Sequence, residues 1–248
     1  MKIALISDIH SNAVALSAVA KHIKNNNCDK IICLGDTVGY GPHPSQCWNW
    51  IKKYCTVILK GNHEDCVCDS YKELNMNRYA IEGCRFARLH MESEKIDELQ
   101  QLPTKVVMEE HSLTICHGSF SEPCAWTYID NPESAETELE LVGTRLCAVG
   151  HTHCPFVFRL GYGLYEYIPN NMLLKSQYKY LINVGSVGQP RDGDCRSAYV
   201  TLEYNENDKD ADVILNLHRV FYDVAKVDAF MEKCNISSFL GDRLYRGE

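Results

Sequence analysis

The chain alternates short, strongly apolar runs with stretches whose apolar residues recur every three or four positions. In the first half, the apolar runs predict buried strands at residues 2–7, 30–34 and 56–60. Helical periodicity predicts a helix at 13–26 with Asn12 as its N-cap, a second helix after Pro44, and interrupted helical segments within 78–101. Strands that alternate with helices are typical of a layered α/β fold.

The second half of the chain is richer in strands. A hairpin is predicted within 104–117, a helix near 133–142, a strand at 146–150 and a last helix near 223–234. Turn residues separate five further apolar segments, which predict an antiparallel run at 155–160, 164–168, 180–185, 197–204 and 212–220. Two facing sheets with helices outside would accommodate this order, in a single domain over 1–248 with a polar surface tail from about residue 237.

Composition changes this picture little. The 248 residues are 45% hydrophobic and 23% charged, as in ordinary globular proteins. No apolar run approaches the roughly 18–20 residues of a membrane span, and Asp8 and His10 interrupt the apolar N-terminal stretch, so neither a membrane segment nor a signal peptide is predicted. The 13 cysteines lack any CxxC pair, which favours free thiols in a reducing cytoplasm over a zinc knuckle built on Cys66 and Cys68.

The net charge is −8, which argues against a partner that is a long nucleic acid, because such binding needs clustered lysine and arginine. A small phosphorylated substrate in a locally positive cleft remains compatible with this charge.

Metal-binding side chains and glycines follow five of the predicted strands. These clusters are Asp8 with His10, Gly35-Asp36, Gly61-Asn62-His63-Glu64, His117-Gly118 and Gly150-His151-Thr152-His153. Ligand sites in open α/β sheets form beyond the carboxyl ends of the strands, so five strands in one sheet would bring all five clusters to one crevice. In an extended segment, residues two apart point to the same side, which would let Asp8 and His10 aim at one place.

The candidate ligands comprise two carboxylates, four imidazoles and one amide oxygen. Seven such groups exceed what one tetrahedral zinc ion needs, and they suit two ions that share a carboxylate, as in many phosphoester-cleaving enzymes. The nitrogen and oxygen donors favour Mn, Fe, Zn or Ni without choosing among them.

The ordered motifs DIH, GDTVGYGP, GNHE, HG and GHTH resemble those of the calcineurin-like metallophosphoesterase superfamily. The resemblance extends from residue 5 to about 190, and it is greatest to the compact bacterial and archaeal phosphodiesterase-like branch, which the segment NVGSVGQPRDGD (183–194) also fits. It implies a hydrolase with a four-layer αββα sandwich of two mixed β-sheets.

Carried over residue by residue, the resemblance implies two metal sites that share Asp36. One metal would take Asp8, His10, Asp36 and His153, and the other would take Asp36, Asn62, His117 and His151. His63 resembles the family's histidine that protonates the leaving group.

The GD motif departs from the GDxxDRG pattern of the family's protein phosphatases, because Gly39 and Tyr40 stand where those enzymes have aspartate and arginine. A dedicated protein phosphatase is therefore disfavoured. The partner that would orient His63 is open, with Glu64 or a backbone carbonyl as candidates.

Three residues are candidate substrate contacts. Arg191 is the best replacement phosphate ligand, and a pair with Asp192 or Asp194 in a surface turn is an equal alternative. Tyr40 is a candidate wall of the crevice, and Asn12 is a helix cap first and a substrate contact second.

The leading interpretation is a dimetal phosphoesterase that hydrolyses phosphodiesters or phosphomonoesters of small molecules, nucleotides included. The alternatives are a non-catalytic interaction scaffold of the same fold and a nuclease of the same superfamily. The sequence leaves the substrate, the ester preference, the native metals and the oligomeric state open.

Overall fold

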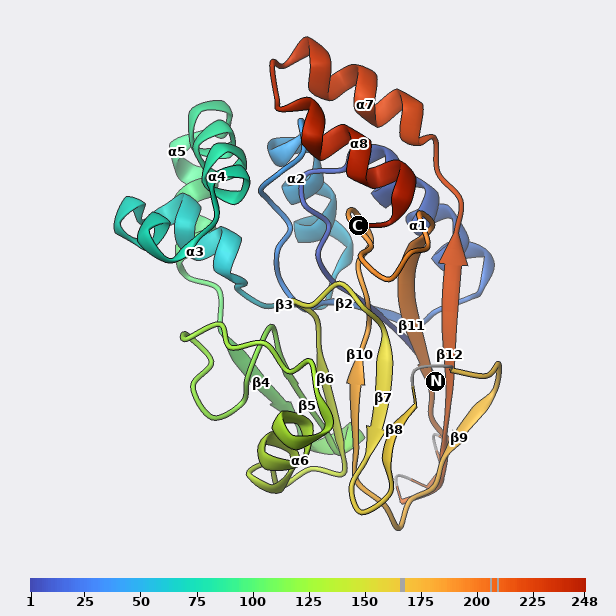
Figure 1. Cartoon of the computed structure of the whole chain (residues 1–248). Helices are drawn as coiled ribbons and strands as arrows, with labels where there is room; N and C mark the ends of the chain where they lie inside the picture. Colours follow the sequence, from blue (N-terminus) through green and yellow to red (C-terminus); the bar gives the residue numbers. More distant parts are fainter. Residues whose placement is uncertain (166–167, 206, 209) are drawn as a thin grey trace.

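Two six-stranded mixed sheets face each other in the protein (Figure 1). The structure is a computed structural model that describes residues 1–165, 168–205, 207–208 and 210–248. The first sheet has the order β3 (Val57–Ile58), β2 (Lys30–Cys33), β1 (Lys2–Ile6), β11 (Ser197–Glu203), β12 (Val213–Val220) and β9 (Met172–Leu174). The second has the order β4 (Lys105–Met108), β5 (Leu113–Cys116), β6 (Leu146–Val149), β10 (Tyr180–Asn183), β7 (Phe156–Arg159) and β8 (Gly163–Tyr165).

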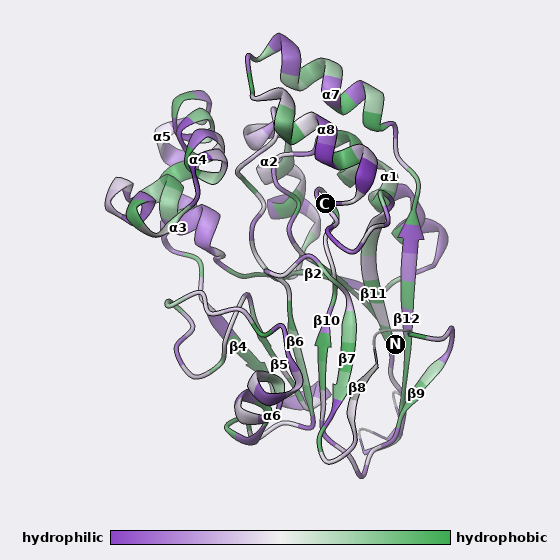
Figure 2. Ribbon diagram, in the orientation of Figure 1, coloured by the Kyte–Doolittle hydropathy of each residue, from purple (hydrophilic) through white to green (hydrophobic). Residues whose placement is uncertain are grey.

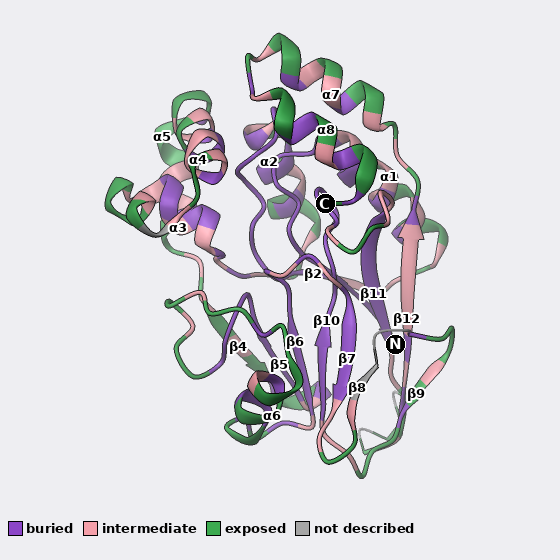
Figure 3. Cartoon of the chain, viewed as in Figure 1, coloured by how far each residue is buried: buried purple, intermediate pink, exposed green. Residues whose placement is uncertain are grey.

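The main core lies between the two sheets. Leu5 of β1, Ile32 of β2 and Ile115 of β5 belong to one cluster of wholly buried side chains there, and the central strands are correspondingly apolar and buried in Figures 2 and 3. Helices α1 (Ala13–Asn25) and α2 (Pro44–Tyr54) bury their apolar sides against the outer face of the first sheet. Helix α6 (Pro132–Glu140) covers the second sheet, which confirms the predicted αββα layering.

The remaining helices surround one end of the sandwich. They are α3 (Asn62–Cys68), α4 (Arg78–His90), α5 (Ser93–Gln100), α7 (Val224–Lys233) and α8 (Ser238–Arg246), with 3₁₀ turns at Ser70–Asn75 and Glu109–His111. The segment after residue 237 is thus a helix rather than a polar surface extension, because Leu240 and Leu244 of α8 are buried against α7 and α4. Within the described ranges, no helix combines the length and apolarity that crossing a membrane requires.

The strand pairing departs from the sequence-based expectation in two ways. The five strands that precede the metal-type motifs do not share a sheet: β1, β2 and β3 run parallel in the first sheet, and β5 and β6 run parallel in the second. The predicted antiparallel run is divided between the sheets, and its member β10 pairs parallel to β6. Residues 166–167 of the expected strand 164–168 lie outside the described residues.

A histidine pair encloses a buried tyrosine on the outer face of the first sheet. The Tyr199 hydroxyl lies 2.8 Å from His22 Nδ1, and the Tyr199 ring stacks on His218 with ring centroids 4.6 Å apart. His218 Nε2 lies 2.9 Å from the Thr201 hydroxyl. Burial, followed by the neighbouring His22, lowers the pKa of His218 to about 4.

We expect this cluster to make folding acid-sensitive. The unfolded histidine has a pKa of about 6.5, so between pH 6.5 and 4 the unfolded chain binds more protons and the free energy of unfolding falls as the pH falls. His218→Gln keeps a polar partner for Thr201 but removes the titration, so its free energy of unfolding should depend less steeply on pH in this window. Urea denaturation of both metal-free proteins from pH 7 to 4.5 measures this, and equal slopes would contradict the assignment.

Candidate metal centre

A cavity of about 220 Å³ opens where the carboxyl ends of the site-bearing strands meet. Its lining includes four of the predicted metal ligands, which are Asp36, Asn62, His151 and His153. The structure brings the predicted ligands together. Within each of three sets, Asp8-His10-His153, His10-Asp36-His63 and Asp36-His117-His151, the ligand atoms lie within 4.8 Å of one another, and Asn62 Oδ1 lies 3.2 Å from His117 Nε2.

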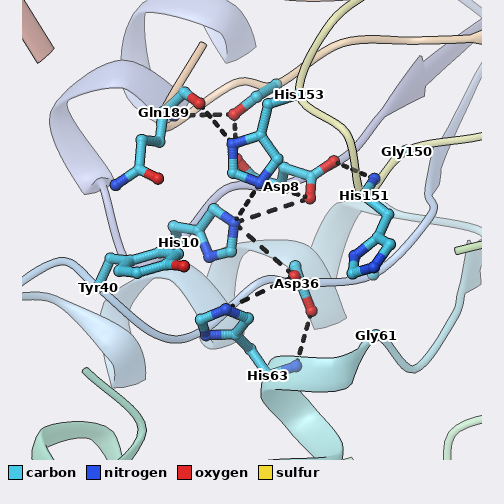
Figure 4. A network of polar contacts seen from close by, with 12 residues as sticks. Asp8, His10, Asp36, Tyr40, Gly61, His63, Gly150, His151, His153 and Gln189 are labelled. Atoms are coloured by element: carbon cyan, nitrogen blue, oxygen red, sulfur yellow. Dashed lines mark hydrogen bonds and ion pairs between the residues drawn. The ribbon is translucent and has the colours of Figure 1, made fainter. Parts of the chain in front are cut away.

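Backbone carbonyls hold the imidazoles of His10 and His153, and Figure 4 shows both rings beside Asp8 and Asp36. His10 Nδ1 lies 3.2 Å from the Val38 carbonyl oxygen, and His153 Nδ1 lies 2.5 Å from that of Gln189. A carbonyl oxygen only accepts, so each Nδ1 carries the hydrogen and each Nε2 presents a lone pair. The two Nε2 atoms nevertheless face each other at 3.1 Å.

The same device orients the other two imidazoles. His117 Nδ1 lies 2.9 Å from the Leu34 carbonyl oxygen, and His151 Nε2 lies 2.8 Å from that of Trp126. The remaining nitrogens, Nε2 of His117 and Nδ1 of His151, are the ones left to face the carboxylates. The Tyr128 ring also stacks on His151, with centroids 4.1 Å apart.

At the centre, acceptor atoms face one another wherever no proton lies between them. His117 Nε2 lies 3.2 Å from both Asp36 Oδ2 and Asn62 Oδ1, and without a metal ion a proton on this nitrogen lies between them. Asp8 Oδ1 is buried without a hydrogen bond, although His153 Nε2 lies 3.2 Å away. Cations between these groups satisfy such an arrangement, and metal-bound histidines commonly donate their other N–H to a carbonyl, so the residues fit metal ions.

Charges in the centre are set by burial and by the carboxylate–imidazole contacts. Burial raises the pKa of Asp36, but nearby imidazoles, chiefly the charged His117, outweigh it and hold the pKa well below the ordinary range, and the pKa of Asp8 also lies well below that range. Burial lowers the pKa of His151 to about 4 and of His153 to about 3, so both are neutral at pH 7. At His117, Asp36 outweighs burial and raises the pKa to about 9, so a metal ion there must displace a proton.

The ligand-bearing turns are strained rather than extended. Asp8, His10, Asp36, His151 and His153 all have positive φ, between 48° and 66°. The residues two apart in these motifs do converge, but not because the segment is extended, as the sequence analysis expected. Left-handed turns direct their side chains to the centre instead. Non-glycine residues in this region cost about 1–3 kcal/mol each and cluster at functional sites.

Glu64 organises two of these turns. Its carboxylate accepts from the backbone N–H groups of Asp36, Thr37, Val38 and Gly61, at 2.7 to 3.1 Å. Burial and the neighbouring Asp36 raise the pKa of Glu64 to about 7, whereas four donors favour the ionised form, which alone accepts from all of them. One sequence-based alternative had Glu64 orient the His63 ring, but its carboxylate holds the backbone of these turns instead. The place of Glu64 directly after Gly61-Asn62-His63 is the signal in the sequence that could have suggested this backbone contact.

The general-acid candidate lies at the cavity beside the metal ligands. His63 Nε2 is 4.0 Å from Asp36 Oδ2, and the ring packs between Tyr40 and His10 with centroids 4.6 Å from each. Burial lowers the pKa of His63 well below its ordinary value.

The candidate substrate contacts separate into two groups. Arg191 and Tyr40 line the cavity, and Arg191 does not pair with Asp192 or Asp194, which bind Arg219 and Arg196 instead. The expectation that Asn12 contacts the substrate is corrected by the structure. Asn12 is buried, its Oδ1 accepts from Ala15 N and its Nδ2 donates to the Gly188 carbonyl, so no polar group of its side chain is left for a substrate.

We expect Glu64→Gln to weaken metal binding, because an amide N–H₂ would face backbone N–H donors. Loss of such a supporting group typically lowers metal affinity about 10–100-fold. Calorimetric titration with Mn²⁺ measures the dissociation constant, with the exposed Glu94→Gln of α5 as a control that leaves it unchanged. An unchanged constant in the Glu64 variant would contradict its role.

Comparisons with known proteins agree with this geometry. Residues 1–207 match the calcineurin-like phosphoesterase superfamily domain. An uncharacterised protein of Methanocaldococcus jannaschii is 34% identical over 249 aligned positions, covering 99% of this chain and 98% of that protein. A metallophosphoesterase from Sphaerobacter thermophilus, known from a crystal structure, is 31% identical in sequence; the match covers 100% of both chains with a TM-score of 0.84. The crystal structure of a hypothetical protein from Pyrococcus horikoshii, 16% identical in sequence, matches 100% of this chain and 98% of that chain with a TM-score of 0.79. The chain therefore belongs to the calcineurin-like phosphoesterase superfamily.

Proposed function

We propose that the protein is a dimetal phosphoesterase that hydrolyses small phosphorylated molecules, with His63 as the general acid. The observation that carries this proposal is the convergence of carboxylate and imidazole electron pairs on one cavity. Family membership supports the reaction class.

The chain's own residues divide into two sets around Asp36, whose Oδ2 lies 3.7 Å from His10 Nε2 and 3.2 Å from His117 Nε2. One set would be Asp8, His10 and His153, and the other Asn62, His117 and His151, with Asp36 shared. When bound, two cations of the Mn, Fe, Zn or Ni type would neutralise phosphoryl charge and supply a nucleophile from water at neutral pH.

His63 would protonate the leaving oxygen. Its Nε2 side faces the centre, and a positioned proton donor contributes about 10²–10⁴-fold to such reactions. The buried ring favours the neutral form, so the incoming phosphoryl charge, which stabilises a nearby cation, would help His63 take up the proton that it then donates.

The cavity favours a small anionic substrate. Arg191 and Lys72 line it beside Asp36, and because Lys72 pairs with Asp65 at 3.4 Å, Arg191 is the main cationic side chain that an anion would meet in a chain whose net charge is −8. Trp126 and Tyr128 offer aromatic surface, which suits a base or another planar group and keeps nucleotides among the candidates. We propose the cytoplasm as the location, on the 13 free cysteines.

We expect protein loaded with a defined metal to hydrolyse p-nitrophenyl phosphate, bis-p-nitrophenyl phosphate or both. His63→Ala should retain both metals but lose about 100-fold or more in kcat on phenyl phosphate, whose leaving oxygen needs a proton, and clearly less on the p-nitrophenyl esters, because only the proton donor is removed. Activity and metal content are measured on the same preparations.

The outcomes separate three accounts. Loss of metal in His63→Ala would make His63 a ligand, as the set His10-Asp36-His63 permits. Absence of hydrolysis with every divalent metal would contradict the proposal and favour an interaction scaffold.

We expect Arg191→Ala to raise KM more than it lowers kcat. The guanidinium donates to Gln189 Oε1 at 2.8 Å and to the Tyr40 hydroxyl at 3.4 Å, which holds it at the cavity wall. Losing a charged hydrogen bond to the substrate phosphate would raise KM about 10-fold or more. Arg196→Ala, which breaks a pair outside the cavity lining, is the matched control, and equal KM values in both variants would exclude Arg191 as a phosphate ligand.

A further inference from the structure

No carboxylate stands at position 39 to hold the Nδ1 side of the His63 ring, although the GDxxDRG pattern has an aspartate there. Gly39 lies there with φ of +93°, and a Cβ atom on it would fall 2.0 Å from His63 Nδ1. No side chain at position 39 can therefore orient this ring without displacing it, and another group must hold Nδ1.

The thiol of Cys84 occupies that place. Its Sγ lies 3.5 Å from His63 Nδ1 and 3.8 Å from the His63 carbonyl oxygen, and both side chains are buried. The S–H can donate to the carbonyl oxygen while the sulfur accepts from Nδ1–H, so both polar atoms of the histidine on this side are satisfied.

Helix α4 is built to bring Cys84 this close. A Cβ on the preceding Gly83 would fall 2.1 Å from Tyr40 N, so only glycine lets the helix pack against the turn that follows Asp36. Arg88 of the same helix donates to the carbonyl oxygens of Cys66 and Val67 on α3. The helix is thus fixed to both elements that carry the His63 site.

We propose that Cys84 is the positioning residue of the general acid: it holds His63 Nδ1 so that Nε2 faces the cavity and the leaving oxygen. This inference rests on the role of His63 in the proposed function and adds the partner that its orientation requires.

A thiol differs from a carboxylate in carrying no charge. The neighbouring Cys66 and burial raise the pKa of Cys84 well above its ordinary value, so the sulfur stays neutral. Cys84 should therefore fix the direction of the ring without adding a negative charge beside it, and its loss should affect proton donation rather than substrate or metal binding.

The leaving group offers a test that a merely structural role would not pass. Phenyl esters need a proton donor more than p-nitrophenyl esters, whose leaving group departs readily as an anion. Cys84→Ala should lower kcat about 10-fold on the phenyl ester, a fraction of the full general-acid effect, with a much smaller loss on the p-nitrophenyl ester and little change in KM. Cys84→Ser should restore most of the loss, because a hydroxyl can make the same contacts.

Cys47→Ala is the matched control, since Cys47 is also a wholly buried thiol of the same apolar cluster but lies on α2 away from His63. It should cost comparable stability without changing the ratio of activities on the two esters. Equal losses on both esters in Cys84→Ala, or the same ratio in both variants, would overturn the proposal.

A second readout does not depend on hydrolysis. Long-range ¹H–¹⁵N NMR of the zinc-loaded protein should report one fixed tautomer for His63 in the wild type and in Cys84→Ser, and averaged ring-nitrogen shifts in Cys84→Ala. An unchanged His63 spectrum in Cys84→Ala would overturn the positioning role. Failure of the wild type to hydrolyse any ester would instead refute the proposed function, so the two failures are distinguishable.

Discussion

Four backbone carbonyls aim four imidazoles at two buried carboxylates, and the rest of the site depends on this constraint. The carbonyls of Val38, Leu34, Gln189 and Trp126 each take one ring hydrogen. Each remaining nitrogen is left as an acceptor inside the protein, where an acceptor without a donor or cation is costly. The arrangement is stable only with positive charge at its centre, supplied either by protons, as at His117, or by metal ions.

This constraint explains why two sheets are needed. The carbonyls of Leu34 and Val38 follow β2 in the first sheet, whereas those of Trp126 and Gln189 follow β5 and β10 in the second. The candidate ligands also follow strands of both sheets. The centre is therefore complete only when the two sheets face each other with the carboxyl ends of these strands together. Left-handed turns deliver the side chains, and Glu64 offsets part of their strain by satisfying four backbone donors.

The layered architecture and the convergence of the motifs could be predicted from the sequence, because strand hydrophobicity and motif order depend on residues that are consecutive in the chain. Sequence patterns misjudged what depends on distant partners. The burial of Leu240 and Leu244 requires α7 and α4, which the polar composition after Ser237 does not reveal. The partition of strands between two sheets and the occupation of Asn12 by Gly188 likewise arise from contacts far apart in the chain. Cys84 was invisible for the same reason, since only the packing of α4 places it beside His63.

The most direct test of the central claim is anomalous diffraction from crystals of the protein loaded with Mn²⁺. The account expects two anomalous peaks per chain, on either side of Asp36 and about 3.5–4 Å apart, as in other two-metal sites. A single peak, or peaks away from Asp36 and the four imidazoles, would contradict it.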